Sequence, residues 1–240
     1  MNNSSLKQLI SSLSTFSLAV IKKHKAIATS LIFSLMLGIN LFLSIKPAFA
    51  HHATGGKLPA NFAEGFISGL AHPVIGIDHL AFVIAIGLLA ALSNKLGIII
   101  PAAFVTATAI GAGIHLLGIN LPAPELIISA SVLTMGIFLA RERQTNLGLL
   151  TTLAAIAGIF HGYAYAESIF GAEMTTLGAY LGGFSLIQLI ISAIAFYAGK
   201  TFLNRSTVKS NMPLRFAGFT ICGVGFSFLA NVIVGLLFPV

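Results

Sequence analysis

The sequence predicts an all-α integral membrane protein with about six transmembrane helices after an N-terminal signal peptide. Hydrophobic residues make up 57% of the 240 residues and charged residues only 8%, whereas a soluble domain has about 25% charged residues. The mean hydropathy is +0.98. The apolar residues also gather into segments that approach or exceed the roughly 20 residues a helix needs to cross the hydrocarbon. These observations exclude an ordinary soluble domain.

The first fifty residues have the features of an export signal. A basic cluster from Lys22 to Lys25 precedes a long apolar run, and small residues follow at Ala48 and Ala50. This is the spacing that signal peptidase cuts, so we expect cleavage after Ala50. An uncleaved signal anchor is the alternative, because the apolar run is long. The expected domains are a signal peptide, 1–50, and a six-helix membrane domain, 51–240.

Six apolar segments follow the signal and are separated by short polar or Gly- and Pro-containing links. They lie near 62–92, 96–117, 123–140, 147–168, 175–198 and 215–237. The first segment is too long for one straight crossing, and it contains Pro73 and Gly76, which disrupt regular helix. We therefore expect this span to be broken at His72-Pro73 or at Gly76, as two half-helices or as a re-entrant turn plus a span.

The positions of Lys and Arg predict the orientation of the spans, because cytoplasmic loops carry an excess of these residues. With the mature amino terminus outside, only Lys57 lies in an outer link. The other Lys and Arg residues after Ala50 lie in inner links: Lys95, Arg141, Arg143, Lys200, Arg205, Lys209 and Arg215. This asymmetry places the carboxyl terminus outside as well.

The only aspartate of the chain, Asp78, lies inside the first span and next to histidines. A charged carboxylate in hydrocarbon costs roughly 2.5–3.5 kcal/mol even on mild insertion scales, so it usually faces a partner, a cavity or an ion. His72 and His79 flank it, and imidazole suits a borderline divalent metal. On an unbroken helix the two imidazoles would lie about 10.5 Å apart along the axis. A break would let His72, Asp78 and His79 converge on one metal ion.

Further candidate metal ligands lie in the later spans and near the mature terminus. His161 and Glu167 fall in the outer part of the fourth span, although Glu167 also fits an interfacial role. Weaker candidates are His115, which also fits a packing role, and His51 and His52 at the mature terminus. The intramembrane histidines and acidic residues all fall toward the same side, so we expect a polar site that opens to the outside.

A stripe of small residues runs along the fourth span beside its histidine. Gly158, Gly162 and Ala166 recur at every fourth position, and such stripes let a neighbouring helix approach closely in a membrane. We expect this neighbour to be the first span, which would bring the two polar clusters together.

These two clusters resemble those of the HupE/UreJ family of bacterial metal permeases. The first family pattern is a histidine, five residues, and Asp-His, which His72, Asp78 and His79 match fully. The second pattern is Phe-His-Gly-x-Ala/Val-His-Gly-x-Glu. It is matched by Phe160, His161, Gly162 and Ala164, whereas Tyr165, Ala166 and Ser168 depart from it and Glu167 stands one residue early. The resemblance covers the whole mature chain.

The resemblance implies a secondary transporter, not an enzyme, that imports Ni²⁺ or Co²⁺ across the bacterial inner membrane to supply hydrogenase, urease or cobalamin synthesis. The expected partners are this ion and the lipid bilayer, with no cofactor. Nucleic acid is not expected, because the cations lie in short links and not in one run. Two alternatives remain open. One is an intramembrane metal-dependent enzyme with Asp78 or Glu167 as general base, and the other is a non-transporting hydrogenase or urease accessory protein.

Overall fold

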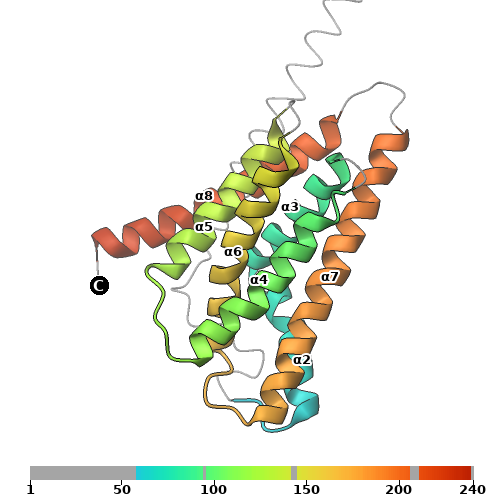
Figure 1. The fold of residues 1–240 in the computed structure, drawn as a ribbon. Helices are drawn as coiled ribbons and strands as arrows, with labels where there is room; N and C mark the ends of the chain where they lie inside the picture. Colours follow the sequence, from blue (N-terminus) through green and yellow to red (C-terminus); the bar gives the residue numbers. More distant parts are fainter. Residues whose placement is uncertain (1–57, 94–95, 142–144, 206–210, 239–240) are drawn as a thin grey trace, which may run out of the picture.

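Every regular element in the described part of the chain is a helix (Figure 1). The computed structural model describes residues 58–93, 96–141, 145–205 and 211–238. The helices are α2 (Phe62–Ile75), α3 (Ile77–Leu92), α4 (Ile99–Leu116), α5 (Pro124–Ala140), α6 (Leu147–Glu167), α7 (Met174–Arg205) and α8 (Met212–Leu237). The all-helical prediction is confirmed for these ranges. The expected signal peptide, with His51 and His52, lies outside the described residues.

Several of these helices are long and apolar enough to cross a membrane. Four pass this test singly, namely α4, α6, α7 and α8, and α2 with α3 passes as one span bent by 79°. Helix α5 is apolar but has only 17 residues. The chain therefore has the helices of a multi-pass membrane protein, and a sixth crossing at 123–140 stays a prediction.

Local sequence signals explain where several helices begin and end. Asn61 accepts a hydrogen bond from the backbone N–H of Glu64, whose carboxylate accepts from the backbone N–H of Ala60, so the two side chains cap the start of α2 reciprocally. Asn146 caps α6 in a similar way. Helix α7 continues past the predicted end at 198, because Gly199 packs inside the helix against Ala91 of α3 and does not begin a link.

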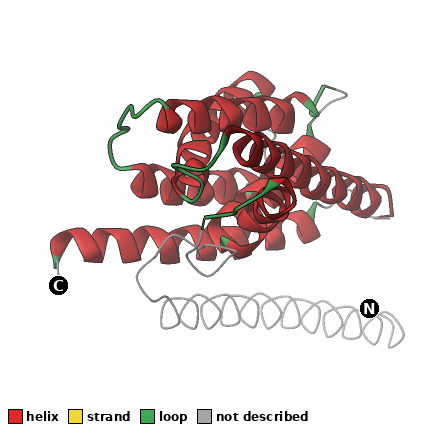
Figure 2. Cartoon of the chain, turned by 90° about the horizontal axis from the view of Figure 1, so that it is seen from below, coloured by secondary structure: helices red, strands yellow, loops and turns green. Residues whose placement is uncertain are grey.

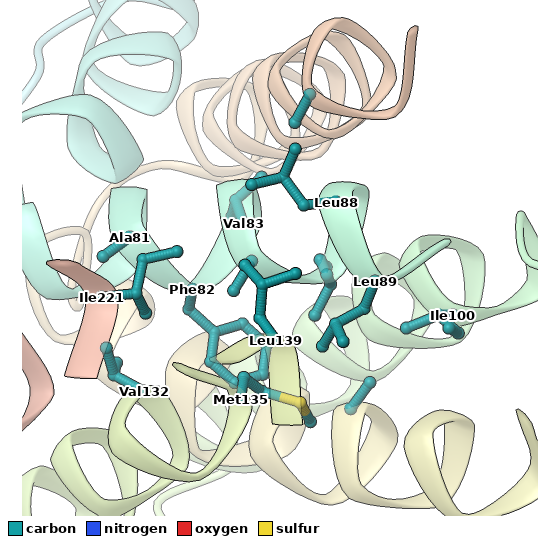
Figure 3. Packing of buried hydrophobic residues seen from close by; sticks show 14 of the residues in the cluster. Ala81, Phe82, Val83, Leu88, Leu89, Ile100, Val132, Met135, Leu139 and Ile221 are labelled. Carbon is teal, nitrogen blue, oxygen red and sulfur yellow. The ribbon is translucent and has the colours of Figure 1, made fainter. Parts of the chain in front are cut away.

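Helix α3 lies at the centre of the bundle and contacts α4, α5, α7 and α8. Figure 3 shows the packing around it, where Phe82 lies near Val132, Met135 and Leu139 of α5. In a membrane the lipid tails are as apolar as these side chains, so the helices are held together by close packing more than by exclusion of water. The buried side chains of α3 therefore fix the positions of the helices around the break that precedes it.

Helix α4 runs along α6 at very short range. A Cβ atom added at Gly158 or Gly162 would collide with the backbone carbonyl of Phe104 or of Thr108, respectively. The small-residue stripe thus permits a close approach, as predicted, but its neighbour is α4 and not the first span. This prediction was wrong because the stripe shows only that some helix comes close, and not which one.

The first span instead packs along α7. Gly65 and Gly69 of α2 lie against the backbone carbonyls of Thr176 and Tyr180, so α2 and the N-terminal half of α7 are in close contact. Helix α8 lies against α5, and in Figure 2 its C-terminal part extends past the other helices. Helix α7 therefore packs along both halves of the broken span, whereas α4, α5 and α8 contact its second half, α3.

Candidate metal site

The first span breaks at Gly76, between α2 and α3. Gly76 has φ −73° and ψ 100°, which other residues also adopt, so its backbone angles do not require glycine. Glycine is required because there is no room for a side chain: a Cβ atom here would lie 2.6 Å from Cδ2 of His79. Pro73 lies inside α2 and does not end it, and His72 lies in the last turn of α2. Of the two expected positions for the break, the structure has the one at Gly76 and not the one at His72-Pro73.

Asp78 lies in the first turn of α3, next to this break. Its Oδ1 atom accepts a hydrogen bond of 2.8 Å from the backbone N–H of His79. A carboxylate at this position is stabilised by the unpaired N–H groups at a helix N-terminus, which Gly76 cannot cap with a side chain. The side chain of Asp78 is half-buried, so its negative charge lies at the edge of the histidine cluster.

The break brings three histidines from three helices together, as the sequence predicts. The ring centroids of His72 and His79 lie 5.9 Å apart. The Nδ1 atoms of His79 and His161 are separated by 2.8 Å, which is hydrogen-bond distance. All three side chains are buried. The cluster lies roughly 9 Å, or six helical residues, inside the end of the bundle at which α6 ends and α7 begins.

Hydrogen bonds determine which nitrogen of His79 and His161 carries the proton. Ser131 Oγ donates to the carbonyl oxygen of Ile128 at 2.6 Å, so it accepts from Nε2 of His161 at 3.1 Å. A neutral His161 then has its lone pair on Nδ1, where it accepts the proton of His79 Nδ1. The lone pair of a neutral His79 is consequently on Nε2.

His72 is oriented by two hydroxyl groups that the sequence did not identify as part of the site. Its Nδ1 atom lies 2.9 Å from the Tyr180 hydroxyl and 3.2 Å from Ser168 Oγ. Both hydroxyls also contact the carbonyl oxygen of Tyr165, at 2.8 Å and 3.0 Å, respectively. When both hydroxyls donate to this carbonyl, Nδ1 of His72 donates to them, and the lone pair of His72 is on Nε2.

Tyr165 fills the space between the histidines. Its ring centroid lies 5.1 Å from that of His72 and 4.6 Å from that of His79, in edge-on contacts. The side chain is completely buried, and its hydroxyl has no hydrogen-bond partner among the described residues. Tyr165 therefore packs against both imidazoles and fills the space beside them.

Other candidate ligands do not join this cluster. His115 packs against Tyr163 and Phe170, with ring centroids 4.4 Å and 5.5 Å away, and Glu167 is exposed. Glu125 lies at the start of α5, within electrostatic range of Asp78 and Glu167. In the described part of the chain, no group of three or more His, Cys, Asp and Glu side chains is arranged to hold a metal ion. The cluster instead places imidazole rings close to a carboxylate and to hydroxyl groups.

The sequence model of the family described as HupE / UreJ protein matches residues 39–228. The chain belongs to the HupE/UreJ family. It is also 30% identical over 152 residues to Protein HupE from Rhizobium leguminosarum bv. viciae, a match that covers 62% of this chain and 74% of that protein. No solved structure matches the chain.

The positions at which this HupE/UreJ protein departs from the second family pattern are all buried, and two of them contact the histidines. Tyr165 contacts His72 and His79, Ser168 bonds to His72, and Ala166 is completely buried. Tyr180 and Ser131 belong to neither pattern, and the sequence offered little to mark them. The available signal was Tyr180 itself, a polar side chain six residues into the apolar helix α7.

Proposed function

We propose that this protein is a secondary transporter that imports Ni²⁺ or Co²⁺ across the bacterial inner membrane. The observation that carries the proposal is the meeting of His72 and His79, one from each half of a broken span, in the buried interior of the bundle. Broken helices in membrane proteins are tolerated where they line an ion path or a cavity. The proposal involves no catalytic step and no resident cofactor.

The hydrogen bonds of the two imidazoles support a role in metal binding. Histidines that bind a metal through one nitrogen usually donate the other N–H to a neighbouring acceptor, which fixes the ring and its tautomer. When Tyr180 and Ser168 both donate to the Tyr165 carbonyl, His72 donates Nδ1–H to these hydroxyls, and His79 donates Nδ1–H to His161, which places the lone pair of both rings on Nε2. We therefore assign His72 and His79 as the imidazole ligands of the ion, with His161 orienting His79.

Asp78 provides the negative charge that a divalent cation needs when it leaves water. Its carboxylate lies in the same turn of α3 as His79 and is only half-buried, so it can meet an incoming ion before the imidazoles do. Glu167 is exposed near the end of α6, and we propose that it attracts cations to this end of the bundle without binding them in the cluster.

The membrane potential is sufficient to drive such uptake. A divalent ion gains about 4.6 kcal/mol per 100 mV of inside-negative potential, twice the value for a single charge. The excess of Lys and Arg in the expected inner links orients the histidine cluster toward the outside, with both termini of the mature chain on that side. In this orientation the ion enters at the broken span and leaves along α3 and α7.

Uptake by purified protein in liposomes tests the proposal. With an inside-negative potential, we expect saturable uptake of ⁶³Ni²⁺ or ⁵⁷Co²⁺ that Asp78→Asn and His79→Ala abolish. His115→Phe is the matched control, because His115 lies outside the cluster in an aromatic environment that phenylalanine preserves. Folded, correctly oriented wild-type protein that takes up neither ion would contradict transport and favour the accessory role.

A further inference from the structure

Tyr165 carries a polar group that the proposed function does not use. Its side chain is completely buried, and its hydroxyl has no hydrogen-bond partner among the described residues. This hydroxyl can donate one proton and accept hydrogen bonds at its oxygen, and a buried polar group that is left unpaired costs about 1–3 kcal/mol. Phenylalanine would fill the same space without that cost. Packing alone therefore does not account for a tyrosine at this position.

Two other hydroxyl groups of the cluster take part in hydrogen bonds within the protein. The Tyr180 hydroxyl and Ser168 Oγ both bond to the carbonyl oxygen of Tyr165, and both lie at hydrogen-bond distance from Nδ1 of His72. The hydroxyl of Tyr165 differs from them, because it orients no side chain and bonds to no carbonyl in the described chain. It is therefore suited to a partner that is not part of the protein.

The ring that carries this hydroxyl lies against the groups that we assign to the ion. It contacts the imidazoles of His72 and His79, with ring centroids 5.1 Å and 4.6 Å away. The hydroxyl itself is within electrostatic range of the Asp78 carboxylate. An ion that is held by the two imidazoles and balanced by Asp78 would therefore bind next to Tyr165.

Two imidazoles and one carboxylate do not fill the coordination shell of a divalent transition-metal ion. Even a four-coordinate ion with three protein ligands keeps water in its fourth position, and the positive charge of the ion makes the bound water a stronger hydrogen-bond donor. We propose that the Tyr165 hydroxyl accepts a hydrogen bond from a water molecule bound to the transported ion, and that Tyr165 is thereby a further binding residue of the site. This inference rests on the proposed function.

This role predicts that stability and ion binding respond differently to loss of the hydroxyl. Removing an unpaired buried group should not destabilise the folded protein. Removing an outer partner of a metal ligand commonly lowers metal affinity about 10–100-fold. A hydroxyl that served only to hold the fold together would show the reverse, with lower stability and unchanged affinity.

The test compares the full-length wild type with Tyr165→Phe in detergent, with ⁶³Ni²⁺ and ⁵⁷Co²⁺ as the probes. In equilibrium dialysis, we expect the dissociation constant of the ion that the wild type binds to rise about tenfold in Tyr165→Phe. The unfolding temperature without metal should not fall. The rise in unfolding temperature on addition of the ion should be smaller than in the wild type, because this stabilisation depends on the affinity for the ion.

Tyr163→Phe is the matched control, because it removes the same atom from the same helix at a hydroxyl that bonds to Asn120 outside the cluster. It should bind the ion like the wild type. An affinity of Tyr165→Phe within about twofold of the wild type, the range of a neutral substitution, would overturn the inference. A lower unfolding temperature of Tyr165→Phe without metal, or a wild type that binds neither ion, would overturn it as well. A wild type that takes up no ion into liposomes, but whose ion binding is weakened by Tyr165→Phe, would contradict the proposed function and still support this role of Tyr165.

Discussion

The Nδ1 atoms of His79 and His161 lie 2.8 Å apart between α3 and α6, and this contact couples the protons of these two histidines. Since His161 gives its Nε2 proton to Ser131, it can only accept from His79. The lone pair of His79 is therefore on Nε2, the nitrogen that we assign to the metal ion. Ser131 of α5 thus acts on His79 through His161.

Ser131→Ala tests this control. Without the serine acceptor, His161 is free to exchange its tautomer, and His79 loses a fixed proton acceptor. We expect metal affinity to fall by about tenfold or more, as is usual when an outer partner of a ligating histidine is removed. Equilibrium dialysis with ⁶³Ni²⁺ measures the change.

Thr134→Val is the control for Ser131→Ala, because the Thr134 hydroxyl of the same helix donates only to the Ala130 carbonyl. It should bind the ion like the wild type. Equal affinity of Ser131→Ala and the wild type would show that the Ser131–His161 bond does not orient His79.

Gly76→Ala should disrupt the site while the helices stay folded. The added Cβ would lie 2.6 Å from the His79 ring, so this ring must move away from its place beside His72. We expect binding of ⁶³Ni²⁺ to weaken at least about tenfold, within the range seen when ligand geometry is lost. Gly182→Ala is the control, because a Cβ there meets no atom within 4 Å. Unchanged binding by Gly76→Ala would mean that the position of the His79 ring is not critical.

Tyr180→Phe and Tyr165→Phe should differ in their effects on stability. The Tyr180 hydroxyl bonds to His72 and to the Tyr165 carbonyl, so its loss removes two buried hydrogen bonds and should lower the free energy of unfolding by about 1–3 kcal/mol. The Tyr165 hydroxyl has no partner among the described residues, so its removal should not lower stability. Denaturant titration in detergent measures both. Equal destabilisation of the two variants would contradict the hydrogen-bond network around His72.

Uptake should decrease on acidification from about pH 7.5 to about pH 5, the range over which histidine commonly gains its second proton. A protonated imidazole has no lone pair for a metal ion, so His72 and His79 would lose their binding nitrogens. Initial rates of ⁵⁷Co²⁺ uptake at a fixed membrane potential provide the measurement. A rate that does not change over this interval would argue against imidazole ligands.

Much of the candidate site follows from local features of the sequence. An aspartate and two histidines in an apolar segment too long for one crossing predict a polar site at a broken span, and the structure confirms the break and the convergence of His72 with His79. The reason for the break was only partly predictable. Gly76 is needed for its lack of a side chain beside His79, which is a contact between residues and not a property of the local chain.

The sequence by itself determined the helical class, the broken span and the residue types of the site, because hydropathy, segment length and the cost of a buried charge are local properties. Only the tertiary structure decided which helices are neighbours. The spans are apolar on nearly all sides, so periodicity does not reveal which face meets which helix. That choice brought Tyr180 and Ser131 to the histidines, left Glu167 exposed, and placed Gln188 against Thr108.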